Sequence, residues 1–322
     1  MLKKEVGKGE KETMKRVKMK KRNWLRAAAA LLVLVMCAAV VGCGQDEEKK
    51  DGQLSSLTFT TEDFPLIDGA TALAPYYELM ASKMLNLPLE EARQWVLCNK
   101  TDGAYENLIN GKVDMIFCSM PSEEQQAMAD EKGFEFEMTP FLNGGFVFFV
   151  NKDNPVDSLT VEQLHDIYAG KITNWKDVGG EDAEIIAYQR PNNSGSQTGM
   201  YHYIISEDEI MEAPTEMKIA EMGGIVDAVA SYENSEGAIG YSYYYYVTSM
   251  HYTDQIKLLE IDGIAPSDET IADGTYPIIN PSYAIISAAT PKDSAVRDIL
   301  DWLVSEEGQE TAREAGYVPR LQ

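Results

Sequence analysis

The sequence predicts an α/β protein of two lobes, each a mixed, mostly parallel sheet flanked by helices. Its 322 residues are enough for two lobes that each bury a core. A hydrophobic content of 44% with 25% charged residues is typical of a folded globular protein. Strand-like apolar runs alternate with amphipathic segments of helix length, which is the rhythm of βαβ units.

The first half of the chain follows this alternation. Strands are expected where β-branched and aromatic residues gather, at 57–63, 95–101 and 113–120. Helices are expected at 75–85, 89–94 and 104–110. The stretch that follows holds two strand-like runs separated by Asn143-Gly144-Gly145, and it forms either a hairpin or a strand that passes from one lobe into the other.

The second half continues the pattern. Helices are expected at 159–170, after Gly195, at 224–232 and as one closing helix over 294–316, and strands at 184–190, 238–247, 256–262 and 283–287. The tyrosines of 238–247 are expected to alternate in burial along a strand rather than to form a ligand site. We expect the chain to enter the second lobe near 143–151 and to return near 240–248. Lobe 1 is then 57–143 plus 247–322, and lobe 2 is 144–246.

The amino-terminal segment has the pattern of a signal peptide over residues 1–42. Basic residues crowd positions 1–26, and the uncharged run from Ala27 to Val41 is shorter than the ~20 residues of a membrane-spanning helix. The run ends in Val40-Val41-Gly42-Cys43, which resembles the bacterial lipobox. We therefore expect acylation of Cys43, a lipid anchor on the extracytoplasmic face of the cell membrane, and a flexible tether over 43–56. Translation starts at Met1, Met14 or Met19.

Charge and composition exclude several classes of function. The whole chain carries a formal net charge of −24, which disfavours nucleic acid as a partner because phosphates need a basic surface. Removal of residues 1–42 leaves 17 basic against 49 acidic residues, so the exported part is more acidic still. His165, His202 and His251 lack the spacing of metal ligands, and we expect neither a metal site nor a cofactor.

Three loops each follow an expected strand and open a helix with small or hydroxyl-bearing residues: 68–72, 99–103 and 190–198. A helix amino terminus exposes unpaired N–H groups and about half a positive charge, so several such ends aimed at one cleft form an anion site. The alternative is that Thr71, Thr101 and Ser194 are ordinary helix N-caps.

Arg190 differs from those hydroxyl residues because it stands directly before the turn at Ser194 and after an apolar strand. From that position a guanidinium can contact an oxyanion through two hydrogen bonds. A salt bridge to one of the many acidic residues is the alternative.

Five stretches, spread over residues 57–320, carry a family resemblance. They are DGATALAP, NGKVDMIFCSMPSEEQ, VNKDNPVDSLTVEQLHDIYAGKITNWKDVGG, IIAYQRPNNSGSQTGM and EGAIGYSYYYY. Together they resemble the phosphate-binding lipoproteins of bacterial phosphate ABC transporters. The resemblance implies a type II periplasmic-binding-protein fold with two crossover strands and a ligand between the lobes. It also implies capture of phosphate or a related oxyanion by a monomer that delivers it to an ABC permease.

The family's ligand-binding positions fall on nine residues of this chain. They are Ala70, Thr71, Ala72, Thr101, Ser119, Arg190, Ser194, Gly195 and Ser196. Two positions depart from the family pattern, because Ser119 and Asn192 stand where the best-known members carry acidic residues. A hydroxyl can donate as well as accept, whereas a carboxylate only accepts, so the choice between hydrogen phosphate and sulfate stays open.

The resemblance also bears on the cysteines that remain after processing. The family's strand order places the 57–63 strand between the 95–101 and 113–120 strands. Cys98 and Cys118 would then be too far apart for a disulfide, whose Cα atoms lie roughly 4.4–6.8 Å apart. We expect two free thiols.

Two other classes of function compete with transport. A sensory or adhesive surface lipoprotein could use the same fold without a permease. A phosphohydrolase would need an activated nucleophile or a metal cluster, and Ser194-Gly195-Ser196 has neither a G-x-S-x-G setting nor a nearby histidine. We therefore expect that the protein is not an enzyme.

Overall fold

The structure, a computed structural model, describes residues 55–231 and 237–320. The expected signal peptide, the lipidation site at Cys43 and nearly all of the expected tether lie outside these residues. Within them no helix is both long enough and apolar enough to cross a membrane. The end of the expected tether is fixed to the folded body, because the backbone N–H of Ser56 donates to Glu307 Oε1 over 3.0 Å.

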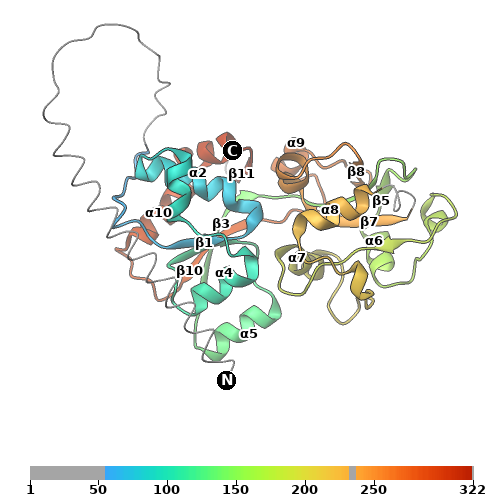
Figure 1. Ribbon diagram of the computed structural model, residues 1–322, viewed down its shortest axis with the longest axis horizontal. Coiled ribbons are helices and arrows are strands. Elements are labelled where there is room, and N and C mark those ends of the chain that lie inside the picture. The colour runs from blue at the N-terminus through green and yellow to red at the C-terminus, as the bar shows by residue number, and fades with distance from the viewer. Residues whose placement is uncertain (1–54, 232–236, 321–322) are drawn as a thin grey trace, which may run out of the picture. The chain divides into compact units, whose positions relative to one another are not determined.

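A five-stranded sheet, called here the first sheet, has the strand order β1-β2-β10-β3-β11. Its strands are β1 Ile67–Gly69, β2 Met115–Cys118, β10 Ser282–Ser287, β3 Phe136–Asn143 and β11 Val318–Pro319. The helices around it are α2 Ala74–Leu85, α3 Leu89–Ala92, α4 Lys100–Ile109, α5 Glu123–Glu131, α10 Ala295–Leu303 and α11 Glu306–Glu314 (Figure 1). Short 3-10 turns lie at Thr71–Leu73 and Arg93–Trp95.

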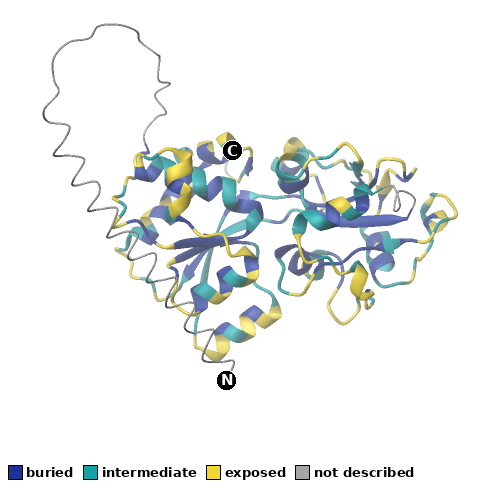
Figure 2. Cartoon of the chain, viewed as in Figure 1, coloured by how far each residue is buried: buried dark blue, intermediate teal, exposed yellow. Residues whose placement is uncertain are grey.

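A four-stranded sheet, the second sheet, has the order β6-β7-β4-β8. Strands β5 and β9 form a separate pair. Its strands are β6 Ile186–Ala187, β7 Ala238–Tyr243, β4 Phe146–Asn151 and β8 Ile256–Leu258, and the pair is β5 Ser158–Leu159 with β9 Glu260–Ile261. Its helices are α6 Val161–Tyr168, α7 Gly195–Tyr203, α8 Met222–Ala230 and α9 Asp268–Ala272, with 3-10 turns at Trp175–Val178 and Thr215–Met217. The inner strand β4 is buried along its whole length, and its neighbour β7 is buried up to Ser242 (Figure 2).

Each sheet has a hydrophobic core of its own, so each sheet with its helices forms a lobe. Phe148 and Trp175 belong to the core of the second sheet, and Tyr76 and Phe117 to that of the first. The expected mixed α/β class with two lobes is confirmed. The expectation of mostly parallel strands was wrong, since β10 pairs antiparallel with β2 and β3, and β4 pairs antiparallel with β7 and β8.

The Gly144-Gly145 turn joins the two lobes and is not the tip of a hairpin. β3, before it, pairs in the first sheet, whereas β4, after it, pairs in the second. The return crossing comes later than the expected 240–248, because β8 still pairs with β4. The chain rejoins the first sheet at β10, and the two crossings meet where Asn280 N–H donates to Gly144 O over 2.7 Å. The assignment of 247–272 to the first lobe was therefore wrong, since β9 and α9 also belong to the second lobe.

The edge of the first sheet also differs from expectation. Residues 57–63 form no strand, because Thr60 begins a turn in which its hydroxyl donates to Asp63 Oδ2 over 2.7 Å. The strand that lies between Val96 and Met115 is instead β1, and both residues partner Ile67. Only a bridge at Val96 remains of the expected 95–101 strand, since α4 already begins at Lys100.

The tyrosine run is strand only as far as Tyr243, and a π-helical turn follows at Tyr246–Met250, so the expected strand to residue 247 was too long. The two cysteines are free thiols as expected, with Cys98 exposed and Cys118 buried in β2. β1 separates their chain segments, which is the role expected of the 57–63 strand.

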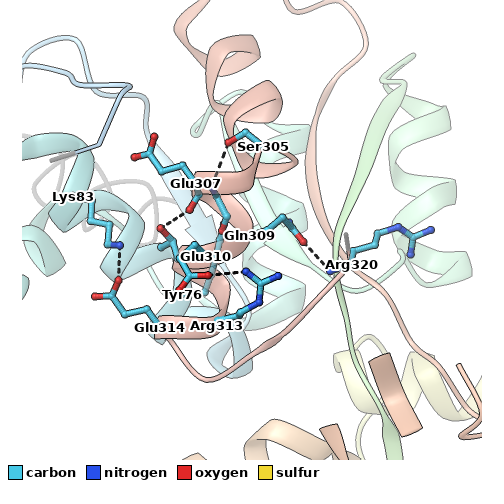
Figure 3. Close-up of polar contacts among 11 residues, drawn as sticks. Tyr76, Lys83, Ser305, Glu307, Gln309, Glu310, Arg313, Glu314 and Arg320 are labelled. Atoms are coloured by element: carbon cyan, nitrogen blue, oxygen red, sulfur yellow. Dashed lines mark hydrogen bonds and ion pairs between the residues drawn. The ribbon is translucent and has the colours of Figure 1, made fainter. Parts of the chain in front are cut away.

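The closing amphipathic segment is two helices rather than one. α10 ends at Leu303, and Ser305 starts α11 by accepting a hydrogen bond from Gly308 N–H over 3.3 Å. Figure 3 shows the polar contacts of α11, among them the hydroxyl of Tyr76 directed to Gly308 O. α11 ends before Gly316, whose φ of 84° suits glycine, as the sequence predicts.

Gln309 ties α11 to the first sheet and to the end of the described chain. Its side chain is 2% exposed. Nε2 donates to Phe141 O over 2.9 Å and to Leu303 O over 2.7 Å, and Oε1 accepts from Arg320 N–H over 2.8 Å (Figure 3). One amide therefore holds β3, α10 and the segment after β11 together.

We expect Gln309→Ala to lower the free energy of unfolding by about 2–3 kcal/mol, because it leaves buried backbone groups without partners. Urea unfolding followed by circular dichroism measures this. The control is Gln126→Ala, which changes an exposed glutamine of α5 and should leave the midpoint unchanged. Equal midpoints for the two variants would show that Gln309 is not a structural tie.

Candidate functional site

Three hydroxyl groups from three elements surround one point in front of Gly195. A Cβ atom on Gly195 would lie 2.8 Å from Thr101 Oγ1, 3.1 Å from Ser119 Oγ and 3.1 Å from Tyr243 OH. Thr101 belongs to the first turn of α4, Ser119 follows β2, and Tyr243 ends β7. The first two come from the first lobe and the third from the second. A side chain at position 195 would press against these hydroxyls, so at least the Thr101 hydroxyl would have to move.

Arg190 is buried in the second lobe, and its charge acts on Tyr243, one of the three hydroxyl residues at this point. The residue is 6% exposed, and its Nε and Nη1 atoms have no hydrogen-bond partner among the described residues. Burial lowers the pKa of its guanidinium, but an arginine keeps its charge at physiological pH. No described acidic residue forms a salt bridge with Arg190. The alternative of a salt-bridged arginine is therefore not what the structure shows.

The backbone of Arg190 is held by two side chains that sequence reasoning missed. Its N–H donates to Gln197 Oε1 over 2.9 Å and to Tyr241 OH over 3.0 Å. The Tyr241 hydroxyl in turn donates to Gln197 Oε1. α7 and β7 together thus fix the backbone position from which the Arg190 side chain extends. Gln197 could have been found in the sequence, because it stands three residues after Ser194, in the first turn of the helix that Ser194 caps.

A buried carboxylate, also missed, holds the two loops of the first lobe. Asp68 is fully buried, and its Oδ1 accepts from Gly69 N–H and Asn99 N–H, each over 2.8 Å. Its Oδ2 accepts from the side-chain amides of Asn99 and Asn107, each over 2.8 Å. Asp68 therefore joins the loop before Thr71 to the start of α4, where Thr101 lies.

The expected glycine-alanine-threonine turn lies at the edge of the site. Ala70 and Ala72 line a cavity that Ser119 and Tyr243 also line. The N–H of Ala70 donates to Phe117 O over 2.9 Å, so this amide is already used within the protein. Thr71 Oγ1 lies 3.9 Å from Cys98 Sγ. Neither Thr71 nor Thr101 is an N-cap, because the caps of their helices are Ala70 and Asn99.

Ser194 and Ser196 open α7 in different ways. Ser194 is the N-cap, and its Oγ accepts from Gln197 N–H over 3.2 Å. The N-cap alternative is thus correct for this residue, although its hydroxyl can still donate. Ser196 is 1% exposed and its Oγ has no described partner. The amino terminus of α7 therefore carries a partial positive charge and, in the Ser196 hydroxyl, a donor without a described partner.

The two departures from the family pattern have separate surroundings. Asn192 is exposed and lies beside α7, where its Nδ2 donates to Glu207 Oε1 over 2.6 Å and its Oδ1 accepts from Tyr201 OH over 2.8 Å. Ser119 is half-buried and its Oγ has no described partner. Only Ser119 is therefore among the groups that converge on Gly195.

The lobes contact each other around the site through two residues with left-handed backbones, Asn193 (φ 65°) and Lys100 (φ 62°). Asn193 Oδ1 accepts from Ser122 Oγ over 2.6 Å, and its Nδ2 donates to Glu124 Oε2 over 2.7 Å. Lys100 Nζ pairs with Glu221 Oε1 over 2.7 Å. These bonds join α4 and the start of α5 in the first lobe to the loops before α7 and α8 in the second.

The geometry is that of a substrate-binding protein: two lobes with separate cores, two crossing segments, and donors from both lobes facing one point. The model of the PBP superfamily domain matches residues 66–307. The phosphate-binding protein PstS of Staphylococcus aureus (strain USA300) is 30% identical over 258 residues, which cover 78% of this chain and 76% of the relative. PstS of Bacillus subtilis (strain 168) is 26% identical over 302 residues, covering 93% and 95%. The chain belongs to the PBP superfamily and, within it, to the family of the phosphate-binding proteins PstS.

Solved structures agree on the fold. A phosphate ABC transporter substrate-binding protein from Clostridium perfringens, solved with bound phosphate, has a TM-score of 0.62 at 24% identity and covers 79% of this chain and 98% of its own. An ABC-type phosphate transport receptor from Vibrio cholerae has a TM-score of 0.60 at 24% identity, with the same coverage of 79% and 98%. The periplasmic-binding-protein fold expected from the sequence is confirmed.

We expect Asn193→Gly to shift the protein about tenfold toward separated lobes, because glycine keeps the left-handed backbone but removes the bonds to Ser122 and Glu124. Fluorescence energy transfer between dyes on the two lobes measures the shift. The matched control is Asn86→Gly, at another left-handed position (φ 50°) that ends α2. If both variants keep the wild-type transfer efficiency, the Asn193 contacts do not hold the lobes together.

Proposed function

We propose that this protein captures phosphate, or a closely related tetrahedral oxyanion, between its lobes and delivers it to an ABC permease. The observation that carries the proposal is that hydroxyls from both lobes meet at Gly195, while Nε and Nη1 of the buried Arg190, whose charge acts on Tyr243, have no partner among the described residues. An oxyanion satisfies all these donors at once, since it carries negative charge and several acceptor oxygens. Its curated relatives are named phosphate-binding proteins, which supports the same ligand here.

The proposed ligand-binding residues are the nine named in the sequence analysis, and they have different roles in binding the anion. Arg190 supplies the positive charge, and Thr101, Ser119, Ser194 and Ser196 supply hydroxyls. Gly195 supplies close backbone approach at the start of α7, and Ala70, Thr71 and Ala72 form the wall of the first lobe. No reaction is part of this function, because the groups that converge are donors that hold an anion.

The proposed setting is the extracytoplasmic face of the cell membrane. The chain would be held there as a monomer by a lipid on Cys43, after loss of residues 1–42. Two solved structures of the same fold are named as a phosphate ABC transporter substrate-binding protein and an ABC-type phosphate transport receptor, which favours a permease partner over the alternatives of a sensory or adhesive lipoprotein. No metal or cofactor is part of the proposal.

We expect Arg190→Ala to weaken phosphate binding by about 2–5 kcal/mol, because a desolvated charge pair is lost. Calorimetric titration of the phosphate-free protein with inorganic phosphate measures the loss. Arg93→Ala is the control, since Arg93 pairs with Glu78 and Glu90 on the surface and should leave the affinity unchanged. Wild-type affinity in Arg190→Ala would remove Arg190 from the site.

A further inference from the structure

Tyr243 stands out among the tyrosines of its strand. Tyr241, two residues earlier and therefore on the same face of β7, has its hydroxyl engaged by Gln197 and by the Arg190 N–H. The hydroxyl oxygen of Tyr243 is also buried. Ser119 and Asn280 lie near enough to act on its pKa as hydrogen-bond partners, but no hydrogen bond of good geometry joins it to a described residue. The family resemblance does not single out Tyr243.

The place of this hydroxyl makes it part of the anion site. It lies 3.1 Å from the position that a Cβ atom on Gly195 would take, as does Ser119 Oγ, and both oxygens are buried without a hydrogen bond of good geometry. A buried polar group without a well-placed partner is unfavourable, so two of them at one point indicate a shared ligand. The charge of Arg190 acts on Tyr243, and Nε and Nη1 of this arginine also have no partner among the described residues. Burial raises the pKa of Tyr243 to about 12, so the phenol keeps its proton for donation.

The carboxylates nearest to these groups are engaged elsewhere. Both oxygens of Asp68 accept hydrogen bonds from the loops that it joins. Glu221, whose charge acts on Arg190, is paired with Lys100. The groups at Gly195 are thus hydroxyls, and the charge that acts on the Tyr243 hydroxyl is that of the Arg190 guanidinium. A carboxylate must find a proton on its ligand, but a hydroxyl can donate to a fully ionised oxygen or accept from a protonated one.

We propose that Tyr243 is an anion-binding residue of the cleft, and that the Tyr243 and Ser119 hydroxyls admit sulfate as well as phosphate. The proposal rests on the proposed function and names the selectivity of that same site. Sulfate has no proton to donate at neutral pH, so it is rejected only by a site that would leave a buried acceptor unpaired. Here the hydroxyls of Tyr243 and Ser119 can rotate and donate to the sulfate oxygens, so no buried acceptor is left unpaired when sulfate binds.

The test is calorimetric titration of the phosphate-free protein with inorganic phosphate and, separately, with sodium sulfate. The wild-type dissociation constant for sulfate is expected within about tenfold of that for phosphate. Tyr243→Phe should weaken both anions about tenfold, the value of one hydrogen bond to a charged group. The matched control is Tyr168→Phe, which removes another buried, unpaired hydroxyl, from α6, and should change neither affinity.

A second variant tests the selectivity between sulfate and phosphate, which a purely structural effect would not change. Ser119→Asp places an acceptor at the point and should weaken sulfate at least tenfold more than phosphate, which a purely structural role of Ser119 does not predict. Thermal unfolding of each variant reports its folding. Should Tyr243→Phe not fold, the wild-type sulfate affinity and Ser119→Asp still decide the selectivity, and Tyr243→Trp decides the ligand role through the same two titrations.

The outcomes separate this inference from the proposed function. Tight phosphate binding with sulfate more than a thousandfold weaker would overturn the selectivity while leaving phosphate capture intact. Wild-type affinities in a folded Tyr243→Phe would remove Tyr243 from the site. Failure of the wild-type protein to bind either anion would overturn the proposed function itself.

Discussion

The site of the first lobe depends on one buried carboxylate. Asp68 accepts four hydrogen bonds from N–H donors of Gly69, Asn99 and Asn107, so its charge is stabilised by uncharged neighbours that it also positions. Because Gly69 ends β1, Asn99 directly precedes α4 and Asn107 lies in the last turn of α4, the carboxylate fixes the distance between the loop at Thr71 and the hydroxyl of Thr101. Without these hydrogen bonds, few interactions would hold the two loops, which are rich in small polar residues, in one conformation. The opposite lobe uses the same device with uncharged groups, since Gln197 and Tyr241 hold the backbone of Arg190.

The sequence was sufficient for the parts of the fold that depend on local pattern. The α2 helix, the strand that contains Cys118 and the turn that opens α7 lie close to where periodicity and capping residues predict them. Pairing of distant segments was harder to predict. β1, the edge strand of the first sheet, has only three residues, Ile67–Gly69. The run at 57–63 precedes it and has more strand-forming residues, so strand propensity favoured that segment wrongly. The return crossing was misplaced because an apolar tyrosine run looks alike whether it continues as a strand or turns into a helix.

The candidate site shows the same division. Residues on loops with small or hydroxyl side chains could be named from the sequence, and Thr101, Ser119, Gly195 and Arg190 are brought close together. Residues that act through side chains of a strand or helix interior were missed. Tyr243 looks in the sequence like any buried strand tyrosine, and Asp68 looks like a turn residue. Their roles follow from which hydrogen bonds are made and which are not, and that information exists only in three dimensions.

The acidity of the protein raises a last physical question, since an anion must approach a surface of strongly negative charge. Exposed charges are screened over about 8 Å at physiological ionic strength. In the proposed site, in contrast, the donors at Gly195 would contact the ligand at hydrogen-bonding distance inside a buried pocket, where screening is weak. The long-range field therefore acts mainly on the rate of approach, and the local donors act on the strength of binding. Acidic side chains can accumulate on the exterior without loss of affinity as long as none reaches the point where the hydroxyls and Arg190 converge. Lys100 contributes to this separation, because it neutralises the carboxylate of Glu221, whose charge acts on Arg190.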